Sequence, residues 1–175
     1  MSNFDGCQLP CVPRFSIGPA NAVEQSPIKR VKRMLAVPWN YYGKKWLKKA
    51  YYTSVRWRGD SSPQTKAKDL APEIAFVKGD LVRVRAHEEI LSTLDPFKEL
   101  KGCAFLPDMV QYCSTTQRVL KSMQIFLDER DYKVKKVRGV ILLEDVICNG
   151  TPAFGACDRC CFLFWRKEWL EKIAD

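Results

Sequence analysis

The chain is 175 residues long, with 46% apolar and 28% charged residues, which is the composition of an ordinary globular protein. No apolar stretch approaches the roughly 20 residues of a membrane span, and residues 1–28 lack the continuous apolar core of a secretory signal. These features exclude collagen-like, membrane-spanning and wholly disordered proteins. They favour one compact domain with an appendage, located in the cytoplasm.

The eight cysteines have to be interpreted for that compartment. Reducing conditions favour metal ligation by thiolates, or buried free thiols, over disulfide bonds. Metal binding is therefore one of the two expected uses of these residues.

The formal net charge of +9 comes from one part of the chain. Residues 28–68 contain twelve Lys or Arg and one acid, Asp60, and so carry a net charge of +11. The rest of the chain is slightly acidic. We expect any contact with a polyanion to map to this basic segment.

The first 72 residues divide into two parts. Residues 1–27 are rich in Pro, Gly, Ser and Asn without periodicity, which predicts an irregular lead. Residues 28–72 form a basic aromatic segment, in which residues 44–58 are predicted to be an amphipathic helix and residues 59–72 a linker. The predicted apolar stripe of that helix consists of Trp46, Leu47, Ala50, Tyr51, Ser54 and Val55.

The basic segment also interleaves aromatic residues with its cations. That pattern suits base stacking combined with phosphate neutralisation on single strands, and it also suits an amphipathic helix that packs on a small domain. We favour docking and keep a nucleic-acid-binding module, using residues 28–68, as the alternative function. The aromatic residues are Trp39, Tyr41, Tyr42, Trp46, Tyr51, Tyr52 and Trp57.

The third part, residues 73–175, has the pattern of a small sheet. Residues 81–85 alternate apolar with basic side chains, as a half-buried strand does, and residues 87–94 fit a short helix whose first turn carries Glu88 and Glu89. Further strands are predicted at residues 118–125, 134–145 and 162–165, followed by a helical turn through Trp169 and Ile173.

The phrase Phe-Val-Lys-Gly-Asp-Leu-Val-Arg-Val, residues 76–84, resembles the first strand of SH3-like barrels, including that of the β subunit of nitrile hydratases. Short strands punctuated by Gly and Pro are typical of small barrels. The predicted fold is mainly β: a small SH3-like barrel with an N-terminal basic amphipathic helix and a short C-terminal helical turn.

Four thiols lie within fourteen residues of turn-forming sequence between Cys148 and Cys161. Thiolates are soft anionic ligands of Zn²⁺ and of iron–sulfur clusters, and four of them close a tetrahedral site. Spacing leaves two sets open, one with Cys157 and Cys160 and one with Cys157 and Cys161. The competing interpretation is that these cysteines are small buried hydrophobic residues.

If only three ligands come from this loop, a fourth has to come from elsewhere. Cys113 is our choice, because it is expected at a strand edge, and Cys103 is the reserve. Cys7 and Cys11 lie in the irregular lead and are discounted as ligands.

Residues 76–170 also resemble a family of largely uncharacterised bacterial proteins that are often encoded near natural-product or polysaccharide biosynthesis genes. The shared phrases are residues 77–85, 88–95, 105–109, 112–113, 142–150 and 157–170, the last beginning Cys-Asp-Arg-Cys-Cys-Phe-Leu-Phe-Trp. Family members hold Ser or another small residue at the position of Cys160. The resemblance therefore implies the metal ligands Cys113, Cys148, Cys157 and Cys161.

The chain departs from the family at one point, because Leu127 stands before Asp128 where many members have a fifth cysteine. The basic helix lies outside the resemblance. His87 is the only histidine and is expected to be exposed at a helix start, which disfavours a catalytic triad. No phosphate-binding or dinucleotide-binding glycine motif is present in the sequence.

A site closed by four thiolates leaves no open coordination position for a substrate. We therefore expect the metal, either Zn²⁺ or an iron–sulfur cluster, to be structural or electron-transferring. The expected function is that of a metal-binding accessory, electron-transfer or biosynthetic-pathway protein, and the sequence names no reaction.

Overall fold

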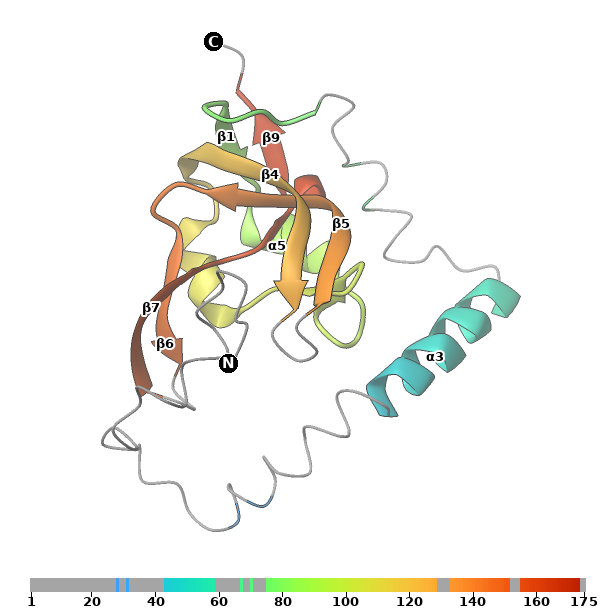
Figure 1. Cartoon of the computed structure of the whole chain (residues 1–175). Helices are drawn as coiled ribbons and strands as arrows, with labels where there is room; N and C mark the ends of the chain where they lie inside the picture. The colour runs from blue at the N-terminus through green and yellow to red at the C-terminus, as the bar shows by residue number, and fades with distance from the viewer. Residues whose placement is uncertain are drawn as a thin grey trace.

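The computed structural model describes residues 28, 31, 43–58, 67, 70, 75–128, 133–151 and 155–173. The predictions for residues 1–27 and for most of the linker at 59–72 lie outside this part of the chain, as do Cys7 and Cys11. The predicted mainly β class is confirmed, and one long helix precedes the strands in the chain (Figure 1).

In the described part of the chain, the long helix α3 is followed by strands and short helices. In chain order, the elements are α3 (Lys44–Arg58), β1 (Leu81–Val84), α5 (His87–Ser92), β2 (Glu99–Leu100), β3 (Cys103–Ala104), the 3₁₀ helix η3 (Pro107–Tyr112), β4 (Thr116–Asp128), β5 (Lys133–Leu143), β6 (Ile147–Thr151), β7 (Gly155–Phe162), β8 (Trp165–Arg166), the 3₁₀ helix η4 (Lys167–Trp169) and β9 (Leu170–Lys172).

Five strands form an antiparallel sheet in the order β8-β5-β4-β1-β9. The first strand, β1, lies between β4 and the last strand, β9, so Val82 pairs with both Gln117 and Lys172. Register shifts after Val119 and Met123 interrupt the β4–β5 ladder, and such bulges bend and twist a strand. Among the described strands no ladder joins β8 to β9, so closure into a barrel is not observed.

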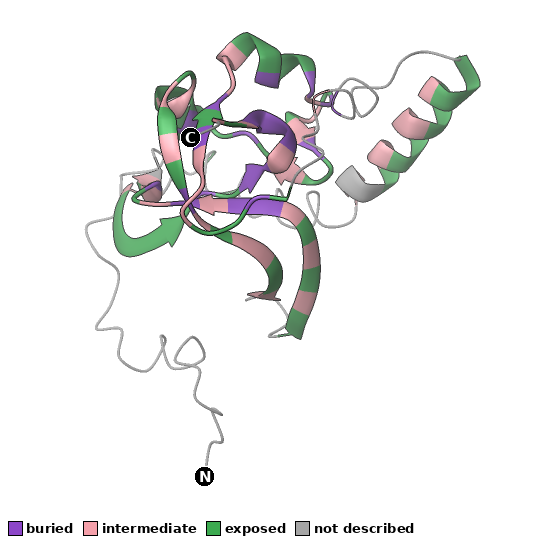
Figure 2. Ribbon diagram, turned by 90° about the horizontal axis from the view of Figure 1, so that it is seen from above, coloured by how far each residue is buried: buried purple, intermediate pink, exposed green. Residues whose placement is uncertain are grey.

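Alternation along β1 places one face of the sheet against the core. Val82 and Val84 are fully buried, whereas Arg83 points to solvent. The core cluster also contains residues of β4 and β5 and the two indoles of Trp165 and Trp169. Buried residues lie in the sheet and in the short helices and loops packed against it, whereas the described side chains of α3 are half-buried or exposed (Figure 2).

The C-terminal segment differs from the prediction of a helical turn through Trp169 and Ile173. η4 ends at Trp169, and the chain then returns to the sheet as β9 beside β1. The indole Nε1 of Trp169 donates to Thr93 Oγ1 at 3.0 Å, which holds η4 against the end of α5. Tertiary pairing with β1 explains why a three-residue strand forms at this point.

A buried carboxylate lies at the same corner of the fold. Glu168 has no exposed surface; its Oε2 accepts from Arg166 Nε at 3.1 Å and its Oε1 from Lys101 Nζ at 2.6 Å. Burial raises the pKa of Glu168, but the hydrogen bonds from Arg166 and Lys101 outweigh it and keep the pKa below its ordinary value.

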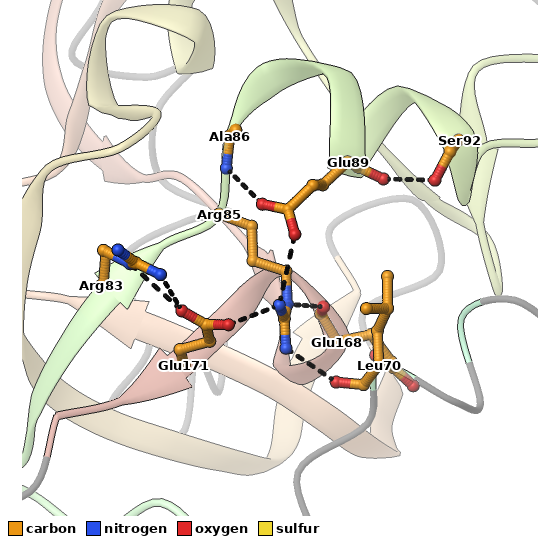
Figure 3. A network of polar contacts seen from close by, with 8 residues as sticks. All are labelled: Leu70, Arg83, Arg85, Ala86, Glu89, Ser92, Glu168 and Glu171. Atoms are coloured by element: carbon orange, nitrogen blue, oxygen red, sulfur yellow. Dashed lines mark hydrogen bonds and ion pairs between the residues drawn. The ribbon is translucent and has the colours of Figure 1, made fainter.

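A second charged network fastens β1, β9 and α5 together (Figure 3). Glu171 accepts from Arg83 Nη2 and from Arg85 Nη1, each at 2.6 Å. Arg85 also contacts Glu89 at 3.6 Å and donates from Nη2 to the carbonyl of Leu70 at 3.3 Å. This network therefore attaches the chain at Leu70, between α3 and β1, to the sheet.

Candidate metal centre on the β6–β7 hairpin

The cysteine-rich stretch that the sequence suggested would be a loop folds as a hairpin of two strands, β6 and β7. Ile147 pairs with Phe162 and Cys148 pairs with Cys161 at the base of the hairpin. Near the tip, Gly150 pairs with Ala156. The register places one cysteine of the cluster directly across the ladder from another.

Between these two groups of pairs the strands are unequal in length. β6 has one residue, Asn149, between its paired positions, whereas β7 has residues 157–160. The additional residues bulge from the ladder, and Cys160 adopts a left-handed φ of 53°, which few non-glycine residues adopt. Cys157 and Cys160 thus stand at the two ends of the bulge.

The two backbones of the hairpin approach each other closely at Gly150. Its φ is +112°, and a β-carbon there would lie 2.1 Å from the carbonyl oxygen of Gly155 and 2.9 Å from the nitrogen of Cys157. A side chain does not fit without a backbone shift. Glycine at 150 therefore permits the close strand approach that positions Cys157.

The Cys148 sulfur lies next to the backbone of its own strand. The N–H of Gly150 points at Cys148 Sγ with an N–S distance of 3.4 Å, and the carbonyl oxygen of Gly150 is 3.5 Å from the same sulfur. The side chain is half-buried against the core cluster. The Cys148 thiol thus donates to the carbonyl of Gly150 and accepts from the N–H of the same residue.

Cys113 follows η3 and packs against the same core cluster as Cys148. Its sulfur is 3.9 Å from the carbonyl oxygen of Met109. Burial, together with the negative charge of Glu88, raises the pKa of Cys113. A metal bound there has to displace the thiol proton, which makes its affinity depend on pH.

The remaining cysteines differ in exposure. Cys157, Cys160 and Cys161 are exposed, and Cys160 Sγ donates to the carbonyl of Asp158 at 3.4 Å. Cys103 is half-buried with its sulfur 3.4 Å from the carbonyl of Phe164, and burial raises its pKa to about 11.

The structure brings together Cys148 and Cys161 of the predicted quartet, with Cys157 in the adjoining bulge. In the part of the chain that the structure describes, no three His, Cys, Asp or Glu side chains already lie in metal-binding positions. The hairpin register was not apparent from the sequence, although Gly150, Pro152 and Gly155 are turn-forming residues that are compatible with a hairpin.

His87 has no part in this cluster. Its ring stacks on Phe105 with centroids 5.8 Å apart, and the side chain is half-buried at the start of α5. The stacking gives the imidazole a packing role, in contrast to the exposed position expected from the sequence.

The basic helix α3 contacts the loop before β2. Lys48 Nζ forms ion pairs with Asp95 at 3.3 Å and with Glu99, and it lies 5.5 Å from the ring centroid of Phe97. Tyr52 donates its hydroxyl to Asp95 at 3.1 Å. These contacts show which side of α3 meets the domain.

The faces of α3 differ from the predicted stripe. Leu47, Tyr51 and Val55 are half-buried, whereas Trp46 and Ala50 are exposed. The predicted single apolar stripe is therefore divided between two faces of the helix.

Among the described residues, no helix has both the length and the apolar composition needed to cross a membrane. No protein-family model, no curated protein and no solved structure matches this chain.

Proposed function

We propose that this protein binds Zn²⁺ or an iron–sulfur cluster through Cys113, Cys148, Cys157 and Cys161. The observation that carries the proposal is the pairing of Cys148 with Cys161 across the β6–β7 ladder. Paired residues of an antiparallel ladder have β-carbons about 4.5–5.5 Å apart. Metal–sulfur bonds of about 2.3 Å let two such sulfurs share one ion.

The other two proposed ligands come from different parts of the chain. Cys157 stands at the start of the bulge in the same strand as Cys161, where the backbone is released from the ladder. Cys113 packs against the core on which Cys148 also rests. Binding would therefore connect the exposed hairpin to the end of η3 and cross-link two distant parts of the chain.

The chemistry of the donor set fits a soft metal. All four ligands are cysteines, and their thiolates are the soft anionic donors that Zn²⁺ and iron–sulfur clusters prefer. With four thiolates the coordination is closed, so the metal would stabilise the fold or carry electrons. Thiolate ligation requires reduced cysteines, which is why the proposal includes a cytoplasmic location.

An SH3-like barrel is part of the same proposal. It is supported by the position of β1 between β4 and β9, which makes the first and last strands of the sheet neighbours. The register shifts in β4 and β5 supply the bending that a small barrel needs. In such a protein the role would be that of an accessory, electron-transfer or biosynthetic-pathway component.

The test is metal analysis of the full chain purified without an affinity tag under anaerobic conditions. One equivalent of zinc in colourless protein, or iron and sulfide with visible charge-transfer absorbance, is the expected result. Protein that is folded, reduced and free of both zinc and iron, and that takes up neither on reconstitution, overturns the proposal.

A further inference from the structure

The two sides of α3 have different surroundings. Lys48 and Tyr52 face the domain and contact Asp95. On the outer side, Trp46 is 70% exposed and Trp57 is 87% exposed. Docking of the helix therefore uses one face and leaves the two tryptophans in solvent.

The two indoles border an open groove of about 520 Å³ on this outer face. Trp57 follows Trp46 by eleven positions, or about 16 Å along a helix axis at 1.5 Å per residue. The other residues that line the groove are small or polar: Lys49, Ala50, Thr53 and Ser54. Two exposed indoles with small side chains between them suit planar ligands that stack on aromatic rings.

The charge of the helix identifies the kind of ligand. α3 contains six Lys or Arg and no Asp or Glu. Asp95 and Glu99 neutralise the charge of Lys48, whereas Lys49, Arg56 and Arg58 are exposed. A polyanion would therefore meet exposed cations beside both tryptophans.

The composition of the outer face argues against a bilayer as the partner. A helix that lies in a membrane interface buries a continuous apolar face. In α3 the apolar surface between the two tryptophans is interrupted by the hydroxyl groups of Thr53 and Ser54 and by the charged Lys49. Stacking on isolated indoles with cations nearby is instead how single-stranded nucleic acids are held without sequence preference.

We propose that the outer face of α3 binds single-stranded nucleic acid, with bases stacked on Trp46 and Trp57 and phosphates neutralised by Lys49, Arg56 and Arg58. The Lys48 contacts hold the helix so that this face points away from the domain. This activity is independent of the cysteines and goes beyond the proposed metal site.

The test measures binding of fluorescein-labelled 12-mers of deoxythymidine and of uridine to the full chain by fluorescence anisotropy. Trp57→Ala is expected to weaken binding about 5- to 150-fold, because one stacked base contributes about 1–3 kcal/mol. Trp57→Phe keeps an aromatic ring at this position and should retain most of the affinity of the parent protein. Phe164→Ala removes another exposed aromatic side chain and should leave the affinity unchanged.

Salt dependence tests the electrostatic part of the proposal. Three neutralised phosphates give a slope of log K against log salt of about −2 for a single strand. Lys49→Gln should reduce the slope by about 0.7, whereas Lys136→Gln, at an exposed position of β5, should not change it.

Three outcomes would overturn the proposal. They are absence of oligonucleotide binding at 50 mM salt, equal affinity of the parent and the Trp57→Ala variant, and binding only to phosphatidylserine-containing vesicles. Circular dichroism of each variant establishes that α3 is still helical. Metal content of the same preparations reports separately on the cysteine site.

Discussion

Cys148 of β6 lies directly opposite Cys161 of β7, and these two residues are the last ladder pair before β7 bulges away from its partner. The pair thus marks the boundary between the regular base of the hairpin and the segment that contains Cys157 and Cys160. The position of each cysteine relative to this pair leads to a different expected effect of its substitution on metal binding.

Replacement of Cys161 by Ser should abolish stoichiometric metal binding, because it removes one member of the cross-strand pair. Replacement of Cys160 by Ser should leave the metal in place, because its thiol donates to Asp158 and it is not one of the four proposed ligands. Elemental analysis of both purified variants provides the measurement. Equal metal content in the two variants would contradict this assignment of ligands.

Gly150→Ala should destabilise the hairpin by about 2 kcal/mol, because the added β-carbon would meet the Gly155 carbonyl at 2.1 Å and force the strands apart. Gly102→Ala is the matched control: Gly102 also has a positive φ, +83°, but a β-carbon there meets nothing within 4 Å. Amide hydrogen exchange of β6 and β7 measures the difference. Similar exchange of β6 and β7 in both variants would show that the close approach at Gly150 is unimportant.

Thiol reactivity should separate the cysteines by environment. With a pKa of about 11, Cys103 holds a thiolate fraction of only about 10⁻³ at pH 8, and it is shielded by packing. In metal-free protein, iodoacetamide should therefore modify the exposed Cys157, Cys160 and Cys161 well before Cys103. Mass spectrometry of timed digests measures the order. Urea-unfolded protein, in which all sites should react, serves as the control.

Glu168→Gln should cost about 3–5 kcal/mol of unfolding free energy, because it leaves the buried Arg166 without its charge partner. The same change at Glu144, whose contact with Arg118 at 3.9 Å is exposed, should cost less than about 1 kcal/mol. Urea denaturation at pH 7 compares the two. Equal costs would show that the buried network contributes no more than a surface pair.

Acid should remove the contribution of the same carboxylate. The pKa of Glu168 in the folded protein is below its ordinary value of 4.5, so its stabilising effect is present above that value and is lost as the pH falls through the folded-state pKa. The stability difference between the parent and Glu168→Gln should therefore shrink as the pH falls below 4.5. A difference that is constant from pH 7 to pH 3 would contradict this.

Lys48→Met should loosen α3, because the ion pairs to Asp95 and Glu99 are lost. Burial lowers the pKa of Lys48, but hydrogen bonds and ion pairs to these acids outweigh it, so the net pKa is raised. Lys48 therefore stabilises docking fully below its ordinary value of 10.5 and loses that effect only as the pH rises through the folded-state pKa. Hydrogen exchange in α3 at pH 7 should increase for Lys48→Met and stay unchanged for the exposed Lys49→Met.

Three strands of the central sheet, β1, β4 and β5, could be predicted because their apolar residues follow a pattern that is visible in the local sequence. The alternation of Leu81, Val82 and Arg83 gives β1, and the recurring apolar residues of 118–125 and 134–145 give β4 and β5 within a few residues of their ends. The predicted strand at 134–145 ends two residues too late, because Asp145 adopts a positive φ of 57° in a turn.

The β6–β7 hairpin and β9 could not be predicted in the same way. Residues 155–162 are mostly exposed and lack an apolar alternation, so only the pairing with β6 makes them a strand. The strand β9 contains three residues and depends on β1 for its hydrogen bonds. In both cases a partner distant in the sequence, and not local propensity, determines the structure.

The candidate site was predictable in composition but not in arrangement. The density of cysteines between Cys148 and Cys161 identified the region, and spacing alone left Cys160 and Cys161 as alternatives. The choice between them depends on register, which a four-residue bulge opposite Asn149 sets. Local sequence carries no signal for such a mismatch between two strands.

The hairpin leaves the sheet after β5 and returns to it as β8, and these two strands pair with each other, Ile141 with Trp165. The cysteine-bearing excursion therefore begins and ends at adjacent positions of the scaffold. An insertion whose two ends are adjacent can be shortened, lengthened or transferred without a change in the strand order of the sheet. Evolution and protein engineering can accordingly exchange this unit as a module while the supporting strands keep their order.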